Sequence, residues 1–207
     1  RAPFTVKGKG LHTGLVIEAE FLPAPDNHGY KFQRTDMDGE PVIDALAENV
    51  VNTQRGTVIA KGQVSVSTIE HAMAALYSAG IDNVLIRING PEMPILDGSA
   101  AIFCQKIAEV GLCEQKQEKD YYIVKQRIEV RNDETGASIV VLPDNNFSVD
   151  VMVDYNSPVL GNQYAALESI EDFAQEIAAS RTFVFVREIE PLVKANLIKG
   201  GDLQNAV

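Results

Sequence analysis

Cysteine and long apolar runs are scarce in this sequence, and each scarcity excludes a class of protein. Its 207 residues include two cysteines, Cys104 and Cys113. A secreted disulfide scaffold usually carries more, so we interpret both as reduced thiols. The longest apolar runs, at 139–142 and 182–186, are far shorter than the roughly 20 residues that cross a bilayer. We therefore do not expect a membrane-spanning protein.

Positive charge is also in short supply. The 18 Lys and Arg residues against 29 Asp and Glu residues leave a net charge of −11, which argues against a nucleic-acid-binding surface. An anionic substrate would need a local cationic pocket. The chain opens with Arg1-Ala2-Pro3-Phe4 and lacks the pattern of a secretory signal, so we expect a cytoplasmic location.

The apolar periodicity predicts an α+β fold. Short runs bounded by turn residues are typical of strands, and runs with a period near 3.6 that end at a glycine are typical of helices. The predicted strands lie at 15–22, 30–34, 83–89, 122–131, 137–142, 147–155 and 182–186. The predicted helices lie at 68–79, at about 100–110 with Asp97 or Ser99 as a cap, and at 169–179. We expect the first two strands to form a hairpin.

The polar stretch 113–120 interrupts this periodicity with dense charge, and we place a domain boundary there. The first predicted domain spans 1–115 and the second spans 121–207. The pattern of elements restarts after the boundary, so the second half echoes the first. Its second helix would lie beyond residue 207.

Glu70 and His71 stand side by side in the first turn of the helix predicted at 68–79. One interpretation is a capping box, in which Ser67 caps the helix and the Glu70 carboxylate reaches back to the Ser67 N–H. Because successive helical residues rotate by about 100°, His71 lies opposite the apolar stripe, among small residues that let a ligand approach. That placement suits a metal ligand, and an ordinary surface or core histidine is the alternative.

Five blocks of the sequence resemble, in order and spacing, the motifs of the zinc-dependent UDP-3-O-acyl-N-acetylglucosamine deacetylase family, which commits Gram-negative bacteria to lipid A synthesis. They are Gly10-Leu11-His12-Thr13-Gly14, the run from Thr68-Ile69-Glu70-His71 to Gly80-Ile81-Asp82-Asn83, Pro91-Glu92-Met93-Pro94-Ile95-Leu96-Asp97-Gly98-Ser99-Ala100, Ser180-Arg181-Thr182-Phe183 and Gly200-Gly201. The resemblance implies two similar α+β domains, each a β-sheet with two helices, packed face to face around the active site. The second domain is incomplete in this chain.

The resemblance also implies roles for individual residues. His71 is a zinc ligand, and Glu70 is the general base that takes a proton as water attacks the acetamide carbonyl and acetate leaves. Thr182 is the hydroxyl that hydrogen-bonds the developing oxyanion, and Phe183 is an apolar wall of the site. On pattern alone, Thr182 and Phe183 could instead belong to a buried strand.

Residues 187–207 correspond to the family's insert, whose apolar side chains enclose the fatty acyl chain of the substrate. The candidate substrate-binding positions there are Ile189, Gly201, Leu203 and Ala206, with Leu192 and Leu197 as further lining. An ordinary small core is the alternative. Each buried methylene contributes about 0.8 kcal/mol, so a long acyl chain would dominate the affinity for the substrate. The expected partner is a UDP-sugar that carries a fatty acyl chain.

The remaining histidines, His12 and His28, match no ligand position, and we predict that His12 hydrogen-bonds in a tight turn. A catalytic zinc takes about three protein ligands and a water, and the family's H-K-x-x-D zinc motif would fall beyond residue 207. We therefore predict a zinc-dependent amidase whose metal site residues 1–207 do not complete. A non-catalytic module that binds the acyl group or the nucleotide sugar is the alternative, and the presence of both Glu70 and His71 argues against it.

Overall fold

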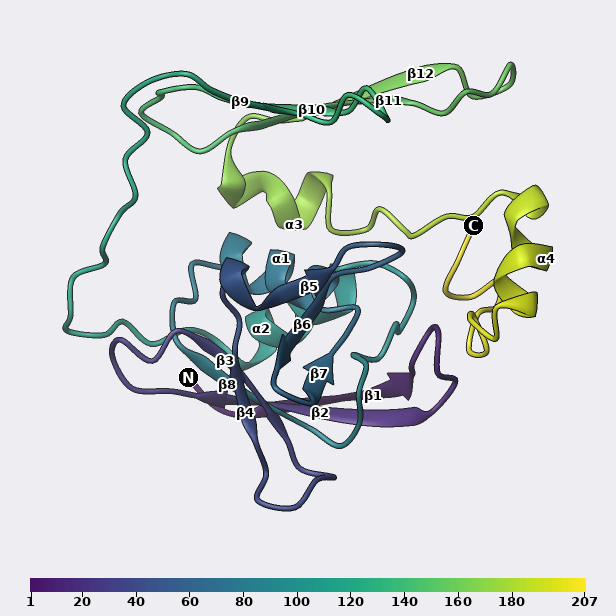
Figure 1. Ribbon diagram of the computed structural model, residues 1–207. Coiled ribbons are helices and arrows are strands. Elements are labelled where there is room, and N and C mark those ends of the chain that lie inside the picture. Colours follow the sequence, from purple (N-terminus) through teal and green to yellow (C-terminus); the bar gives the residue numbers. More distant parts are fainter. The chain divides into compact units, whose positions relative to one another are not determined.

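The computed structural model describes residues 1–207, which form two compact units. The first unit combines residues 1–117 with residues 174–207, and the second unit holds residues 118–173 (Figure 1). Four β-sheets and four α-helices make up the chain, which confirms the predicted α+β class. None of these helices has the length and apolar character of a membrane span. The division into two similar domains, 1–115 and 121–207, stays a prediction.

A five-stranded sheet carries the core of the first unit. Its strands, in spatial order, are β1 (Phe4–Lys9), β2 (Val16–Pro23), β8 (Val84–Ile88), β3 (Tyr30–Arg34) and β4 (Val42–Asp44). The strands predicted at 15–22 and 30–34 are present, but the hairpin between them is wrong, because β8 pairs antiparallel with β2 and parallel with β3. Every second residue of β8 is buried. β8 is also the central strand, so its main chain is hydrogen-bonded to a neighbouring strand along both edges.

Two helices cover one face of this sheet. α1 (Glu70–Ser78) and α2 (Ala101–Val110) pack against each other on the same side of it (Figure 1). Phe21 of β2 contacts Phe103 of α2, with ring centroids 6.0 Å apart. Both helices confirm the sequence prediction. The glycines expected to end them, Gly80 and Gly111, have φ values of 71° and follow the last turns.

A three-stranded antiparallel sheet was not expected from the sequence. It consists of β5 (Val50–Asn52), β6 (Val58–Lys61) and β7 (Val64–Val66). Each strand has only three or four residues, too few for a period-2 pattern to stand out. We call residues 53–57, which connect β5 to β6, the strap. β7 leads into α1 through residues 67–69.

The second unit contains two sheets of two antiparallel strands each. They are formed by β9 (Ile128–Arg131) with β10 (Ser138–Val141), and by β11 (Val149–Asp154) with β12 (Asn162–Leu167). The strands predicted at 137–142 and 147–155 are confirmed, whereas β12 was not predicted. The strand predicted at 122–131 begins only at residue 128, because β10 offers a partner for four residues and no more.

The segment from residue 169 to residue 194 departs most from the sequence prediction. The helix predicted at 169–179 is reduced to a 3₁₀ turn (Ile170–Asp172) and α3 (Phe173–Glu176). The strand predicted at 182–186 is wrong. The Thr182 N–H donates to Gly98 O at 2.7 Å and the Val184 N–H to Val207 O at 3.0 Å, so the main chain finds single partners rather than a ladder. α4 (Val186–Lys194) follows directly.

Candidate active site

The short segment 91–94 is the centre of the candidate site, because two other sequence blocks bridge to it. Ser67 forms a β-bridge with Glu92, and Gly10 forms one with Pro94. The turn at the end of β1 and the entry to α1 are therefore fixed on the same few residues.

Glu92 is fully buried, and three donors satisfy its carboxylate. Its Oε1 accepts the His12 N–H at 2.8 Å and the Thr68 hydroxyl at 3.2 Å, while its Oε2 accepts the Thr13 N–H at 2.9 Å. Such bonds offset the cost of burying a carboxylate. Gly10 is required beside it, since a Cβ there would lie 2.4 Å from Oε2.

Glu70 opens α1, and the strap rather than the helix holds its carboxylate. The Thr57 N–H donates to Glu70 Oε2 at 2.9 Å. The capping-box interpretation is therefore wrong: no side chain caps α1, and the Ser67 hydroxyl donates to Pro91 O at 3.2 Å instead. The local cause is Thr68, whose φ of 58° turns the chain before the helix starts and removes Ser67 from the cap position.

His71 is half-buried in the first turn of α1. Burial lowers the pKa of its imidazole, and the carboxylates of Glu70 and Asp97 counteract part of that shift. The neutral ring is therefore favoured at neutral pH, and this is the form that donates a lone pair to a metal. Asp97 belongs to the block 91–100 and His71 to the block 68–83, so the electrostatic interaction between them links two of the five blocks.

The side chains around His71 do not make up a zinc site by themselves. Among residues 1–207, no group of three or more His, Cys, Asp or Glu side chains is placed to hold a metal ion. A catalytic zinc takes about three protein ligands. His71 and its carboxylate neighbours therefore fall short of that donor set.

Thr182 is fixed against the block that carries Asp97. Its N–H donates to Gly98 O. The adjacent Arg181 clamps the same region, because its Nε donates to Asp97 O at 2.9 Å and its Nη2 donates to Leu203 O at 3.1 Å. These contacts fix the position of Thr182 and do not use its hydroxyl. Ser99 has the capping role expected of it, since its Oγ accepts the N–H of the first residue of α2 at 3.1 Å.

Close backbone contacts complete the convergence of the five blocks in the first unit. A Cβ at Gly98, whose φ is 82°, would lie 1.9 Å from Asn205 O, and a Cβ at Gly200 would lie 2.2 Å from Gly10 O. The buried Asn205 side chain donates to Gly200 O at 2.9 Å. The Gly200 N–H donates to Leu11 O at 3.0 Å. Residues about 190 positions apart are thus in van der Waals contact.

The predicted substrate-binding residues lie at the surface of this assembly. Leu203, Phe183 and Ile189 are 90%, 50% and 37% exposed. Gly201 is exposed and Ala206 is half-buried. An ordinary small core or a buried strand therefore does not describe Leu203, Phe183 or Ile189, and their apolar surface is accessible.

His12 lies in the predicted tight turn, which a bond from the Gly14 N–H to Gly10 O closes at 3.0 Å. Its ring partner is in the strap: Nε2 lies 3.2 Å from Arg55 O, so this nitrogen carries the proton. Its Nδ1 is buried and has no hydrogen-bond partner among residues 1–207. His28 is in the turn at 23–29, where Nδ1 lies 2.9 Å from the next carbonyl oxygen.

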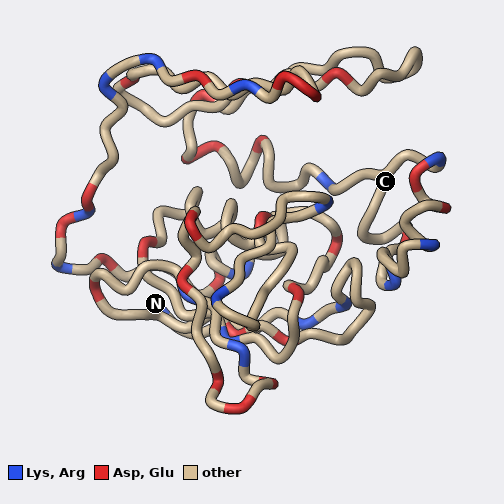
Figure 2. The backbone as a smooth tube through the Cα atoms, viewed as in Figure 1, with Lys and Arg blue, Asp and Glu red and all other residues tan.

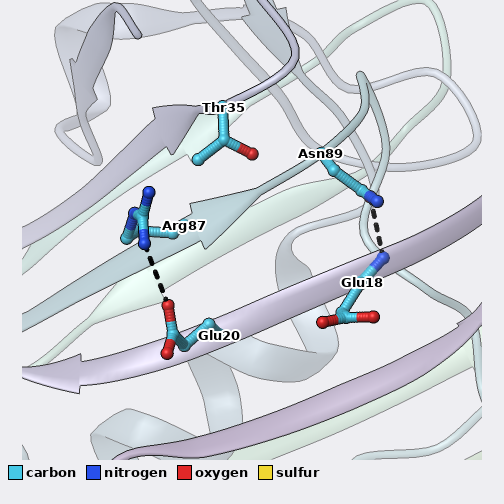
Figure 3. A pocket seen from close by; sticks show the side chains of 5 residues that line it. All are labelled: Glu18, Glu20, Thr35, Arg87 and Asn89. Carbon is cyan, nitrogen blue, oxygen red and sulfur yellow. Dashed lines mark hydrogen bonds and ion pairs between the residues drawn. The ribbon is translucent and has the colours of Figure 1, made fainter.

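A depression of about 230 Å³ occupies the other, solvent-facing side of the five-stranded sheet (Figure 3). It is lined by Glu18, Glu20, Thr35, Arg87 and Asn89. Arg87 pairs with Glu20 at 3.3 Å, and Asn89 Oδ1 accepts the Glu18 N–H at 2.8 Å. Most of its polar groups therefore pair with one another, and no predicted site residue lines it.

Acidic and basic residues are interspersed along the chain (Figure 2). Among the segments that meet at the converged blocks, Arg181 and Lys199 carry positive side chains. They are the candidates for the cationic contacts that an anionic substrate would need.

Four contributors to the site escaped the sequence prediction: Glu92, Arg181, Asn205 and Arg55. The side-chain partners of Glu92, Arg181 and Arg55 are distant in the chain; Glu92 and Thr13, for example, are 79 residues apart. One local signal existed for Glu92, a single charge between two prolines in an otherwise apolar run.

Known proteins resemble this chain over nearly its whole length. The family profile described as "LpxC: UDP-3-O-acyl N-acetylglycosamine deacetylase" matches residues 1–207. The chain is 61% identical over 204 residues to the bifunctional enzyme LpxC/FabZ of Bacteroides thetaiotaomicron and 57% identical over 204 residues to that of Porphyromonas gingivalis, covering 99% of this chain and 44% of each relative. It is 42% identical over 204 residues to the UDP-3-O-acyl-N-acetylglucosamine deacetylase of a Geobacter species (strain M21), covering 98% of this chain and 66% of that relative.

Proposed function

This chain belongs to the LpxC family of UDP-3-O-acyl-N-acetylglucosamine deacetylases, and on that premise we propose that the protein containing it hydrolyses the acetamide of UDP-3-O-acyl-N-acetylglucosamine. The reaction releases acetate and commits the nucleotide sugar to lipid A synthesis. The chain spans 44% of the bifunctional relatives and 66% of the Geobacter deacetylase. The proposal therefore concerns the whole protein.

The observation that supports this proposal is the meeting of Glu70, His71 and Thr182 through the block that carries Asp97. The Asp97 carboxylate acts on the His71 ring, and the next residue, Gly98, binds the Thr182 N–H. Amide hydrolysis needs three groups within reach of one carbonyl group: a general base, a hydrogen-bond donor for the oxyanion and a ligand that holds an electrophilic metal ion.

Glu70 is suited to act as the general base. The Thr57 N–H anchors Oε2, while Oε1 faces Gly56, where a Cβ would lie only 3.3 Å away. The absent side chain of Gly56 keeps space beside that oxygen for a water molecule. A positioned base of this kind contributes about 10²- to 10⁴-fold to a rate.

Thr182 is suited to stabilise the oxyanion. Its main chain is fixed to Gly98, so the position from which the hydroxyl projects is set before the reaction. Such a preorganised donor is worth about 3 kcal/mol in the transition state.

We propose His71 as one ligand of a zinc ion, which when bound lowers the pKa of its water toward neutrality. The burial of His71 favours the neutral, ligating form of the ring. Since residues 1–207 lack a complete donor set, the other ligands would belong to the remainder of the protein.

The exposed apolar residues after residue 182 are the proposed contacts for the acyl chain. Phe183, Ile189, Leu203 and Ala206 supply apolar surface, and Gly201 lets a ligand approach the main chain. Each methylene that they bury would contribute about 0.8 kcal/mol.

Glu70→Gln in the full-length protein tests the proposal. The amide can still accept the Thr57 N–H but cannot take a proton, so turnover should fall by about 10²- to 10⁴-fold with metal content unchanged. Deacetylation kinetics and metal analysis measure the two effects. Glu109→Gln, on the exposed surface of α2, is the matched control and should have wild-type turnover. Wild-type turnover in the Glu70 variant would assign this carboxylate to structure alone.

A further inference from the structure

The strap makes three contacts outside its own sheet, and each reaches a different part of the site. Arg55 O accepts a hydrogen bond from the His12 Nε2–H, with 3.2 Å between Nε2 and the oxygen. Two residues later, the Thr57 N–H holds the Glu70 carboxylate at 2.9 Å. The third contact is an ion pair between the Arg55 guanidinium and Glu188 of α4, at 3.0 Å.

The helix α4 belongs to an excursion that is tied down at both ends. Before it, the Thr182 N–H binds Gly98 O, and after it, the Gly200 N–H binds Leu11 O. Along the helix itself, the charged contacts are mostly internal: Lys194 pairs with Glu190 at 2.6 Å, and Arg187 stacks on the preceding Phe185. Glu188 is the exception, since it reaches the strap.

The Arg55–Glu188 pair has the character of a genuine ion pair. The hydrogen bond from the Arg55 guanidinium holds the pKa of the Glu188 carboxyl below its usual range, although burial opposes the shift. Arg55 has a left-handed φ of 62°. An arginine pays a conformational cost there that a glycine would avoid.

We propose that Arg55 and Glu188 form a latch that holds α4 against the strap and thereby positions both the acyl-binding segment and the Glu70 carboxylate. The latch rests on the proposed function. Arg55 is a positioning residue: it acts on the acyl chain through α4 and on Glu70 through Thr57. Opening the latch frees one side of α4 and loosens the strap that carries the Thr57 N–H.

The size of the effect follows from the exposure of the pair. The two side chains are 48% and 32% exposed. An ion pair in contact with solvent changes an equilibrium by about fivefold at most and weakens as salt screens it. We therefore expect KM for a long-chain substrate to rise by about two- to fivefold when the latch is broken, with a smaller fall in kcat.

The experiment uses the full-length enzyme and four variants: Arg55→Gln, Glu188→Gln, the charge swap Arg55→Glu with Glu188→Arg, and Lys106→Gln as the control. Lys106 forms a pair of similar exposure with Glu109 on α2, at 2.7 Å. Both single latch variants should raise KM for the long-chain substrate, and the swap should restore it. The rise should disappear at about 1 M salt. With a short acyl chain, which α4 would not enclose, neither variant should change KM.

Limited digestion with trypsin supplies a readout independent of activity. The peptide bond after Arg55 lies in the strap, so Glu188→Gln should speed cleavage there by about two- to fivefold while Lys106→Gln leaves the rate unchanged. Unchanged cleavage, or latch variants whose effects add without coupling, would refute the latch.

Changes of KM in opposite directions in the two single variants would also refute the latch. If Glu188→Gln lowers KM while Arg55→Gln raises it, Arg55 binds the anionic substrate directly and Glu188 competes for it. An inactive wild-type enzyme with normal metal content would instead overturn the proposed function, and the acyl role of the latch with it, whatever the digestion shows.

Discussion

Thr68 shows how much local strain this site tolerates. Its φ of 58° lies in a region that β-branched residues avoid, at a cost of about 1 to 3 kcal/mol. The bond from its hydroxyl to the buried Glu92 offsets part of that cost. Strain of this kind persists where the surroundings over-determine a conformation, and here it lies two residues before Glu70. We infer that the strain serves to place Glu70 at the start of the helix, within reach of the strap.

Thr182→Val should remove the oxyanion donor while it preserves volume. The loss should appear in kcat, by roughly a hundredfold, with KM little changed, because the bond forms only as charge develops. Steady-state kinetics on the full-length enzyme separate the two constants. Thr182→Ser, which keeps the hydroxyl, should retain most of the rate. A raised KM at constant kcat would mean that Thr182 binds substrate and transition state equally.

Glu92→Gln should destabilise the fold rather than the chemistry. The carboxylate accepts three bonds on two oxygens, and an amide nitrogen in place of one oxygen would face a donor and leave it unsatisfied. The free energy of unfolding should fall by about 2 to 3 kcal/mol. Denaturant titration measures it, with the exposed Glu18→Gln as a control expected within about 0.5 kcal/mol of wild type. Equal stability of the two variants would contradict the buried anchor.

Individual residues could be singled out where the signal was local. Helical rotation separates His71 from the apolar stripe, whereas the proposed role of Glu70 came from the family motif. The donors that actually hold Glu70 and Glu92 could not be singled out, since Thr57 and His12 come from other segments and contribute main-chain N–H groups, which carry no sequence signature. The proposed roles of Thr182 and Phe183 came from the family motif alone.

At the scale of elements, length and burial decided what could be predicted. α1 and α2 each bury one face over nine or ten residues, so their periodicity and terminal glycines were visible. β5 to β7 are too short to show a period. The apolar segment at 182–186 has strand composition, yet it lies where only single main-chain partners are available. Composition cannot reveal that lack of a neighbouring strand.

Gly98→Ala should break the docking of the last segment onto the block 97–100. Its φ of 82° is unfavourable for alanine, and its Cβ would lie 1.9 Å from the main-chain oxygen of Asn205. Gly39→Ala is the matched control, because its φ is 75° but nothing lies within 4 Å. The control should lose about 1 kcal/mol of stability and Gly98→Ala at least about 3 kcal/mol. Equal losses, measured by thermal unfolding, would mean that strain alone matters and the contact does not.

At the scale of the whole molecule, the second unit exposes much of its apolar surface. Val130, Ile139 and Met152 are 64%, 68% and 72% exposed. Strands with one apolar face normally pack against another layer. Taken by itself, the second unit therefore presents surface of the kind that promotes aggregation.

Residues 1–207 alone should bind a hydrophobic dye, hold zinc weakly and show no deacetylase activity. The expectation follows from the exposed strands and from the absence of a three-donor group among these residues. Metal analysis after dialysis, dye fluorescence and a deacetylation assay can be compared with a protein of the full length of its relatives. Stoichiometric, tightly bound zinc in the short chain would point to His12 or His28 as ligands after all.

The contact between Gly10 and Gly200 has a consequence for synthesis on the ribosome. The two residues touch in the folded molecule, but at about 5 to 20 residues per second the ribosome makes them roughly 10 to 40 s apart. During that interval the five-stranded sheet can close, because its pairs lie within residues 4–88. The Glu92 anchor can also form, because its donors lie at residues 12–68. The contacts that Leu11, Gly98 and Arg55 make with Gly200, Thr182 and Glu188 must wait until residues 174–207 emerge. The site is thus completed last in the first unit, and until then a nascent chain leaves the side that residues 174–207 will cover open to proteases and chaperones.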